Sequence, residues 1–246
     1  GAAHACGRAC LPGCGCGRFI EIANILFIRA QIDARTGQVQ PLVTPFDETV
    51  FGIERLAMAA SQKASVFELD DFQWLVGWIQ TRTVPVDDRL WPNRQIMADH
   101  IRALLFLAAD GAPPPGKGGQ ARIMRKLVRG IITQQKILDL DNSRFISDLI
   151  RETVHLYYKP YPYLAQGQER LLAYFQLEAQ RFEQTLSSSY RRLERIIRRN
   201  SQPVISGEQA LDLVKNYGLP FALLTKFLAH RRVDLDRQAY RRAHQR

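Results

Sequence analysis

The stretch Glu48-Thr49-Val50-Phe51-Gly52-Ile53-Glu54-Arg55 decides how the amino-terminal part of this chain folds. Residues 49–51 combine β-branched and aromatic side chains, which favour a strand. Residues 52–62 follow without a loop and predict a helix, so the strand is expected to lead directly into that helix. Arg55 then lies at the strand-to-helix junction.

Two further strands are expected before this junction. Residues 25–28 form an apolar run suited to a buried strand. Thr36-Gly37 is typical of a hairpin turn, and residues 39–43 predict the returning strand. The amino-terminal part is therefore predicted to contain a small sheet that ends in a helix.

The remainder of the chain predicts helices, with breaks at Gly- and Pro-rich segments. Pro85 and Pro92 bracket an expected linker, and residues 113–119 form a second break. The expected helices cover 70–80, 97–108, 119–138, 143–157, 166–200, a segment opening at the capping box 206–209, 221–230 and 235–246. The sequence thus predicts an α+β fold in two parts, residues 1–85 and an all-α part over 86–246.

The charge balance favours a polyanionic partner. The chain has 246 residues, 34 Lys and Arg against 24 Asp and Glu, a net charge of +10 and a pI near 9.8. Such a balance suits nucleic acid, although a basic protein without such a partner remains the alternative. No apolar run approaches the ~20 residues of a membrane span, and the amino terminus lacks the apolar core of a signal peptide. A cytoplasmic location is expected, with an organelle left open.

All four cysteines fall in one short segment. Cys6, Cys10, Cys14 and Cys16 have the spacing C-x3-C-x3-C-x-C. In an intracellular chain such density favours metal ligation over disulfides, and four thiolates suit zinc. The alternative is a loop of reduced thiols, or thiols whose partners lie in another part of the protein.

Two expected helices carry clusters of cations. Arg122, Arg125, Lys126 and Arg129 share one face of the helix after the Gly-rich break, with Ile123, Leu127 and Ile131 on another. A second cluster contains only Glu194 as an offsetting acid, and its basic members are Arg191, Arg192, Arg195, Arg198 and Arg199. Such faces suit contacts to phosphates, or they are simply solvated.

Several stretches, in order, resemble the alanyl-tRNA synthetases, a family of class II aminoacyl-tRNA synthetases. RFIEIANILFI at 18–28 resembles the strand before class II motif 3, and ETVFGIER at 48–55 resembles motif 3 itself. MADHIR at 97–102, followed by FLAADG at 106–111, resembles the family's I-A-D-H-I-R and F-L-I-A-D-G signature. Near the end, VISGE at 204–208 and NYGLP at 216–220 continue the match.

The resemblance implies a remnant of the class II antiparallel sheet with the motif 3 helix, followed by an all-α tRNA-recognition domain. ATP with Mg²⁺ is the implied cofactor, bound by Arg55 over the adenine and near the triphosphate. Gly52 would allow close approach of the nucleotide, and Glu54 would orient Arg55. The amino acid would be held by Glu48, through its amino group, together with Asn24 and Val50.

The chain departs from the family pattern at several of these positions. Motifs 1 and 2 are absent, so a missing amino-terminal catalytic portion or a separate subunit would have to complete the ATP site. Ala23 replaces the family Trp, while Glu48 and Val50 replace an Asp and a Gly, which alters the pocket for alanine. The implied function is ATP-dependent attachment of alanine, or a related amino acid, to tRNA. The alternatives are a non-catalytic RNA-binding or assembly protein and, more weakly, a ligase for a carrier other than tRNA.

The expected RNA partner is the tRNA acceptor stem, contacted by the cations of the helical part. The family reads the G·U pair of this stem with an Asn and an Asp, and here Lys117 and Lys215 stand at those places. Lysines favour phosphates over base edges, so weak discrimination of the G·U pair is expected. The full set of expected RNA contacts is Lys117, Arg122, Arg125, Lys126, Arg129, Arg191, Arg195 and Lys215.

Overall fold

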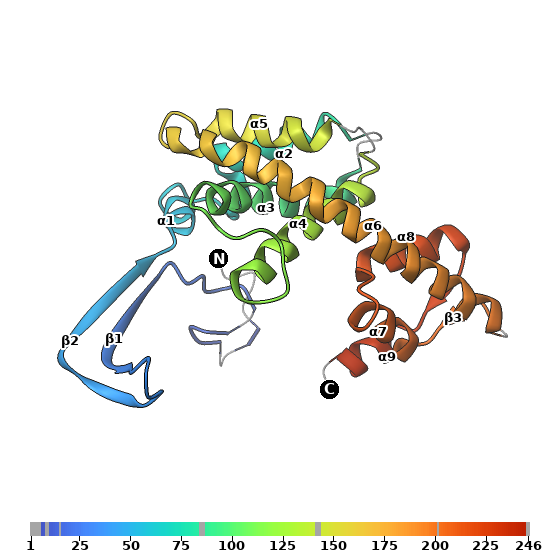
Figure 1. Cartoon of the computed structure of the whole chain (residues 1–246), viewed down its shortest axis with the longest axis horizontal. Coiled ribbons are helices and arrows are strands. Elements are labelled where there is room, and N and C mark those ends of the chain that lie inside the picture. The colour runs from blue at the N-terminus through green and yellow to red at the C-terminus, as the bar shows by residue number, and fades with distance from the viewer. Residues whose placement is uncertain are drawn as a thin grey trace. The chain divides into compact units, whose positions relative to one another are not determined.

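The computed structural model describes residues 6–7, 10–14, 16–83, 87–140, 144–200 and 202–244. The chain divides into two compact units, Gly1–Gln73 and Trp74–Arg246 (Figure 1). The first unit contains an antiparallel hairpin that leads into a helix and a short 3-10 turn. Its elements are β1 (Ala23–Ile32), β2 (Val39–Phe51), α1 (Ile53–Ala60) and η2 (Val66–Glu68). The sequence also predicts a domain boundary between residues 1–85 and 86–246, and this boundary stays a prediction.

The hairpin turn follows directly from its sequence. The Asp33 carboxylate accepts hydrogen bonds from the N–H groups of Arg35 (2.8 Å) and Thr36 (3.0 Å). Gly37 adopts a φ of 69°, a left-handed conformation that favours glycine, as expected for the predicted Thr36-Gly37 turn. The backbone N–H groups of Arg35 and Thr36 also lower the pKa of Asp33.

The expected third strand over 49–51 is wrong as a separate element. Residues 49–51 are the end of β2, which pairs with β1 from Phe46 opposite Ile28 to Phe51 opposite Ala23. Pro41 and Pro45 interrupt the sequence pattern but not the strand. Both strands are edges of a two-stranded sheet, and an edge tolerates residues that lack an N–H.

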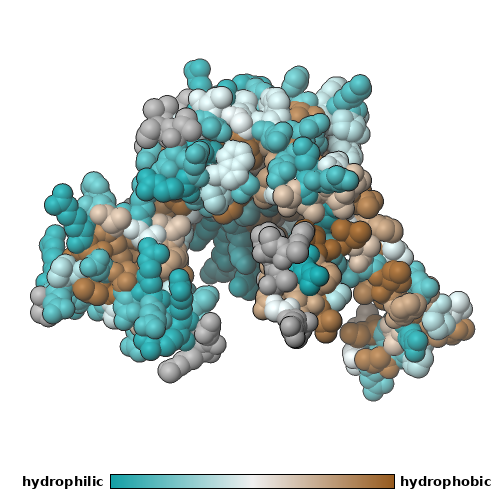
Figure 2. Space-filling model, turned by 180° about the vertical axis from the view of Figure 1, so that it is seen from behind, coloured by the Kyte–Doolittle hydropathy of each residue, from teal (hydrophilic) through white to brown (hydrophobic). Residues whose placement is uncertain are grey.

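The prediction that residues 25–28 form a buried strand is also wrong. Apolar side chains on both faces of the hairpin are exposed, with 61% of Ile25 and 66% of Phe27 accessible on one face and 46% of Leu26 on the other. The reason is that this sheet has only two strands in the described part of the chain. Figure 2 shows apolar residues gathered at the surface of the lobe that this hairpin forms.

The second unit is built from helices, as the sequence predicts. Their bounds lie within a few residues of those expected, apart from an earlier start of α3. The helices are α2 (Asp70–Gln80), which begins in the first unit, α3 (Trp91–Ala109), α4 (Gly119–Ile137), α5 (Phe145–Tyr157), α6 (Gln168–Arg199), α7 (Gly207–Lys215), α8 (Phe221–Arg231) and α9 (Arg237–His244). The short elements are η3 (Asp88–Leu90), η4 (Pro162–Gly167), and the parallel strands β3 (Val204–Ile205) and β4 (Asp234–Leu235).

The prediction of a linker that extends from Pro85 to Pro92 is wrong at its carboxyl-terminal end. Pro92 lies in the first turn of α3, where a helix needs no N–H from it. Pro85 lies outside the described residues. The capping box predicted at the start of α7 is confirmed, because the Ser206 hydroxyl accepts from the Gln209 N–H (3.2 Å) and the Gln209 side chain accepts from the Ser206 N–H (3.0 Å).

The core of the second unit lies where α3 meets α4, η4 and α6. Fully buried side chains come from each of these elements, among them Ile101, Leu105, Val128, Ile131, Leu164 and Leu171. The apolar face of α4 differs from the expected one, since Ile131 is buried but Ile123 is 52% exposed. Met124 and Val128 are buried in its place, in a helix that packs against α3.

Among the helices of the described residues, none has the length and apolar character needed to cross a membrane.

Candidate functional site

The strand-to-helix junction is held by a backbone contact to β1. Gly52 is the N-cap residue of α1, and its N–H donates to the carbonyl of Ile22 at 2.9 Å. A Cβ at this position would lie 3.3 Å from Cδ of Arg55. A side chain at position 52 would therefore require the Arg55 side chain to shift by a few tenths of an ångström.

Arg55 is anchored by Glu21 rather than only by residues of its own helix. Its Nη1 donates to the Glu21 carbonyl oxygen at 2.8 Å and lies 3.9 Å from Oε1 of the same residue. The Arg55 side chain is 51% exposed, so much of the guanidinium remains accessible. The role expected for Glu54 in orienting Arg55 stays a prediction.

Glu21 also links Arg55 to the residues expected to hold an amino acid. The amide Nδ2 of Asn24 donates to Glu21 Oε1 at 3.0 Å. Glu21 was not singled out by sequence reasoning, although it lies within the stretch that carries the family resemblance. Glu21 therefore contacts Asn24 of β1 through its carboxylate and Arg55 of α1 mainly through its main-chain carbonyl, and the side chains of Glu21, Asn24 and Arg55 are exposed.

The hairpin register brings the expected amino-acid-binding residues onto one face. Asn24 pairs with Val50, and Leu26 pairs with Glu48, so these four side chains point to the same side of the sheet. Ala23 pairs with Phe51 on the opposite side. Val50 is 49% exposed, so within the described residues this face is open and no pocket encloses it.

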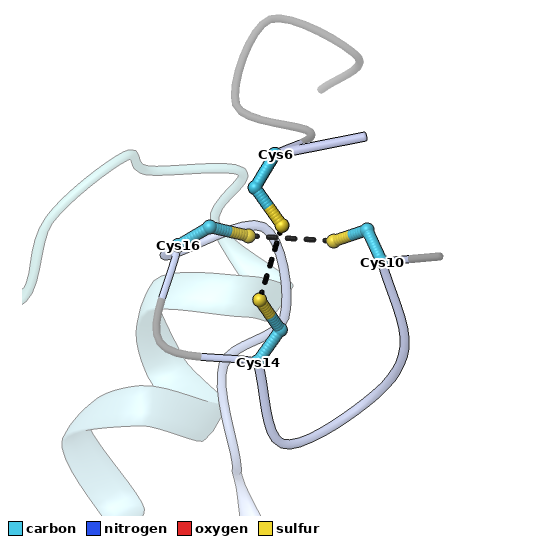
Figure 3. A group of neighbouring side chains, drawn as sticks. All are labelled: Cys6, Cys10, Cys14 and Cys16. Carbon is cyan, nitrogen blue, oxygen red and sulfur yellow. Dashed lines mark hydrogen bonds between the residues drawn. The ribbon is translucent and has the colours of Figure 1, made fainter. Parts of the chain in front are cut away.

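The four cysteines converge at one point (Figure 3). Their Sγ atoms all lie within 4.8 Å of one another, with Cys6–Cys14 at 3.2 Å and Cys10–Cys16 at 3.4 Å. The N–H of Arg18 and the thiol of Cys10 lower the pKa of Cys16 to about 6. The hydrogen bond with Cys14 raises the pKa of Cys6. Sequence reasoning placed these thiols in one segment, and the structure brings their sulfur atoms together.

The cations of α4 are not equivalent. Arg122 and Lys126 are exposed, and Arg125 is half-buried. Arg129 instead donates from Nε to Oε1 of Glu178 on α6 at 2.6 Å, and Glu178 is 1% exposed. The Arg129 guanidinium also lies 4.8 Å from the centre of the Phe182 ring. Arg129 therefore has intramolecular partners on α6, which the spacing of cations along α4 did not reveal.

The second cluster of cations, on α6, is partly neutralised within the unit. Glu194, the acid within it, pairs with Arg231 of α8 at 2.8 Å. Arg192 pairs with Asp212 of α7 at 3.3 Å and lies 4.0 Å from the centre of the Tyr217 ring. The residues expected to contact RNA at this end remain exposed, namely Arg191, Arg195 and Lys215.

A cavity of about 360 Å³ lies at the connection between α3 and α4. Leu107, Gly111 and Met124 are among its lining residues, together with the exposed Ile123. Lys117 belongs to the loop that joins these two helices and is exposed. No sequence signal pointed to this cavity.

Comparison with known proteins establishes the family. The family model described as tRNA synthetases class II (A) matches residues 10–246. An alanine–tRNA ligase of Dehalococcoides mccartyi is 32% identical over 235 residues, which are 94% of this chain and 27% of that protein. The alanine–tRNA ligase of Pelotomaculum thermopropionicum is 30% identical over 250 residues, 99% of this chain and 28% of its own length.

The chain thus spans little more than a quarter of the curated relatives that it matches. Their names agree with the resemblance to alanyl-tRNA synthetases that the motifs at 18–28 and 48–55 indicate, and that resemblance is confirmed. With a family model covering residues 10–246, this chain belongs to the class II (A) tRNA synthetases.

Proposed function

We propose that this chain is part of an ATP-dependent alanine–tRNA ligase. In this proposal residues 1–85 supply one section of the catalytic domain, and residues 86–246 bind the acceptor stem of tRNA. The observation that carries the proposal is Arg55, fixed by Glu21 at the start of α1 in a chain whose relatives are alanine–tRNA ligases.

The nucleotide contact proposed for Arg55 fits its surroundings. A planar guanidinium can stack on a purine ring and attract phosphates at the same time. The half-exposed side chain leaves room for this, and the glycine at position 52 keeps the neighbouring backbone clear. When bound, ATP with Mg²⁺ would activate the amino acid carboxylate. The residues of this chain would then position the reactants and stabilise charge rather than transfer protons.

The amino-acid site is proposed on the face shared by Asn24, Glu48 and Val50. A carboxylate there suits the ammonium group of an amino acid. Because this face is open, a further part of a class II catalytic domain would have to close it, either from the same polypeptide or from a separate subunit. The exposed apolar residues on both sides of the hairpin support this proposal.

ATP–pyrophosphate exchange by the complete natural protein, over a panel of amino acids, tests the proposal. Alanine is expected to support exchange. Arg55→Lys should lower the rate about a hundredfold, because lysine keeps the charge but loses the flat face and the second donor.

Arg35→Lys, at the exposed hairpin turn, is the matched control and should leave the exchange rate unchanged. Exchange with no amino acid, combined with tRNA binding, would contradict the ligase proposal and leave a non-catalytic RNA-binding protein. An unchanged rate in Arg55→Lys would remove Arg55 from the site.

A further inference from the structure

We propose that Cys6, Cys10, Cys14 and Cys16 bind one Zn²⁺ ion as four thiolates. This site is separate from the residues assigned to ATP, amino acid and RNA, and its role is to hold the segment that precedes β1. The structure brings the four sulfur atoms into one cluster (Figure 3).

The spacing of the sulfur atoms is close to that of a tetrahedral zinc site. A Zn–S bond of about 2.3 Å places any two sulfurs of a tetrahedron about 3.8 Å apart. Here the shortest contacts are 3.2 and 3.4 Å, and no pair exceeds 4.8 Å. Figure 3 shows the side chains approaching from four directions, with the Cys6–Cys14 and Cys10–Cys16 contacts crossing near a common centre.

The backbone of the segment is arranged to bring the thiols together. Two turns, closed by Cys10 N–H to the Gly7 carbonyl (3.2 Å) and Cys14 N–H to the Leu11 carbonyl (3.1 Å), place Cys10 and Cys14 at their ends. Gly13 and Gly17 adopt left-handed φ values of 91° and 81° beside Cys14 and Cys16. The chain reverses at these glycines, where other residues would be strained.

The segment has little else to hold it in this conformation. Its described residues before β1 form neither helix nor strand, and Leu11 is 69% exposed. Cys10, at 7% exposed, is the one apolar side chain among them that is buried. Metal binding supplies folding free energy to small segments that lack a hydrophobic core.

The charge of the proposed site is also compatible with its surroundings. Four thiolates around one zinc ion carry a net charge of −2, and binding releases to solvent the protons of those cysteines that are still thiols. No Asp or Glu precedes Glu21 in the sequence, and Arg18 lies two residues after Cys16. The segment that carries the cysteines therefore adds no carboxylate to the negative charge of the proposed site.

Metal analysis of the purified 246-residue chain, produced with zinc in the medium, tests the proposal. One zinc ion per chain is expected, released in step with mercurial titration of the four thiols. Replacement by Co²⁺ should give the visible absorption bands of a tetrahedral cobalt thiolate. Because neither tRNA nor ATP is used, this result is independent of the ligase proposal.

Cys10→Ser and Cys14→Ser should each weaken zinc binding by at least about tenfold, measured by competition with a chromophoric chelator. Leu11→Ser is the control, since Leu11 lies in the same loop and is exposed, and its affinity should match the unchanged chain. A chain that neither contains nor takes up zinc, whether its thiols are free or joined in two disulfides, would overturn the proposal. So would undiminished zinc affinity in both cysteine variants.

Discussion

At the scale of single residues, the buried Arg94 is the least expected side chain. Its guanidinium belongs to α3 and is 0% exposed, and none of its three nitrogens has a hydrogen-bond partner among the residues that the structure describes. The pKa of the Asp87 carboxyl is lowered, chiefly by hydrogen bonds from Arg89 and less by the charge of Arg94. Burial of a charge without hydrogen bonds is costly.

Arg94→Met is therefore expected to stabilise the helical unit by about 1 kcal/mol or more, because methionine fills similar space without a charge. The free energy of unfolding in urea measures the change. Lys159→Met, at an exposed position after α5, should change it by less than about 0.5 kcal/mol. A loss of stability in Arg94→Met would mean that the guanidinium is satisfied in solution.

At the scale of elements, α4 and α6 are joined by two ion pairs of different burial. Arg129 contacts Glu178, which is 1% exposed, whereas Lys136 contacts Glu183 at 2.9 Å with 60% of the Glu183 side chain exposed. Water screens the second pair more strongly than the first. The two pairs provide an internal comparison within the same helix–helix contact.

Glu178→Ala should lower the free energy of unfolding by about 3 kcal/mol, because it leaves the partly buried Arg129 without its carboxylate. Glu183→Ala removes the same number of atoms from an exposed site and should cost less than about 1 kcal/mol. Equal losses for the two variants, measured by urea unfolding, would contradict this account of α4 and α6.

The exposed cations Arg122 and Lys126 of α4 give a second prediction at this scale. Arg122→Gln combined with Lys126→Gln should weaken binding of an acceptor-stem RNA and lower the dependence of log K on log salt by about two, since two phosphate contacts are lost. Fluorescence anisotropy over a range of salt concentrations measures both quantities.

Lys159→Gln combined with Arg151→Gln removes the same charge outside α4 and is the control for this experiment. Neither Arg151 nor Lys159 belongs to the proposed RNA-binding set, and Arg151 pairs with Asp148 at 2.9 Å. If the two double variants weaken binding equally, net charge rather than the α4 face governs the affinity.

At the scale of the whole molecule, a net charge of +10 supports long-range attraction of RNA, while Lys117 and Lys215 bear on specificity. Both lysines are exposed, and a lysine contacts phosphate as a point charge without reading a base edge. Stems that differ only in a G·U or G·C pair should therefore bind with affinities within a few-fold of each other. A preference of about a hundredfold for G·U, roughly 2.7 kcal/mol, would contradict this prediction.

How far the sequence predicts the structure depends on the sequence separation of the interacting residues. The helices of the second unit, the Thr36-Gly37 turn and the Ser206 capping box depend on neighbours only a few positions apart, so their local pattern suffices. The predicted returning strand ended at residue 43, whereas β2 continues to Phe51 because residues 46–51 pair with β1, which is distant in sequence.

The sequence by itself determined the family, through motifs that keep their order along the chain, and the positions of the helices, through short-range periodicity and capping. The tertiary structure decided which potential site residues have partners. Arg129 meets Glu178 across 49 positions, Arg55 meets Glu21 across 34, and four sulfurs meet at one point. These contacts depend on how helices and strands pack, and a side chain's periodic position does not specify what lies opposite it.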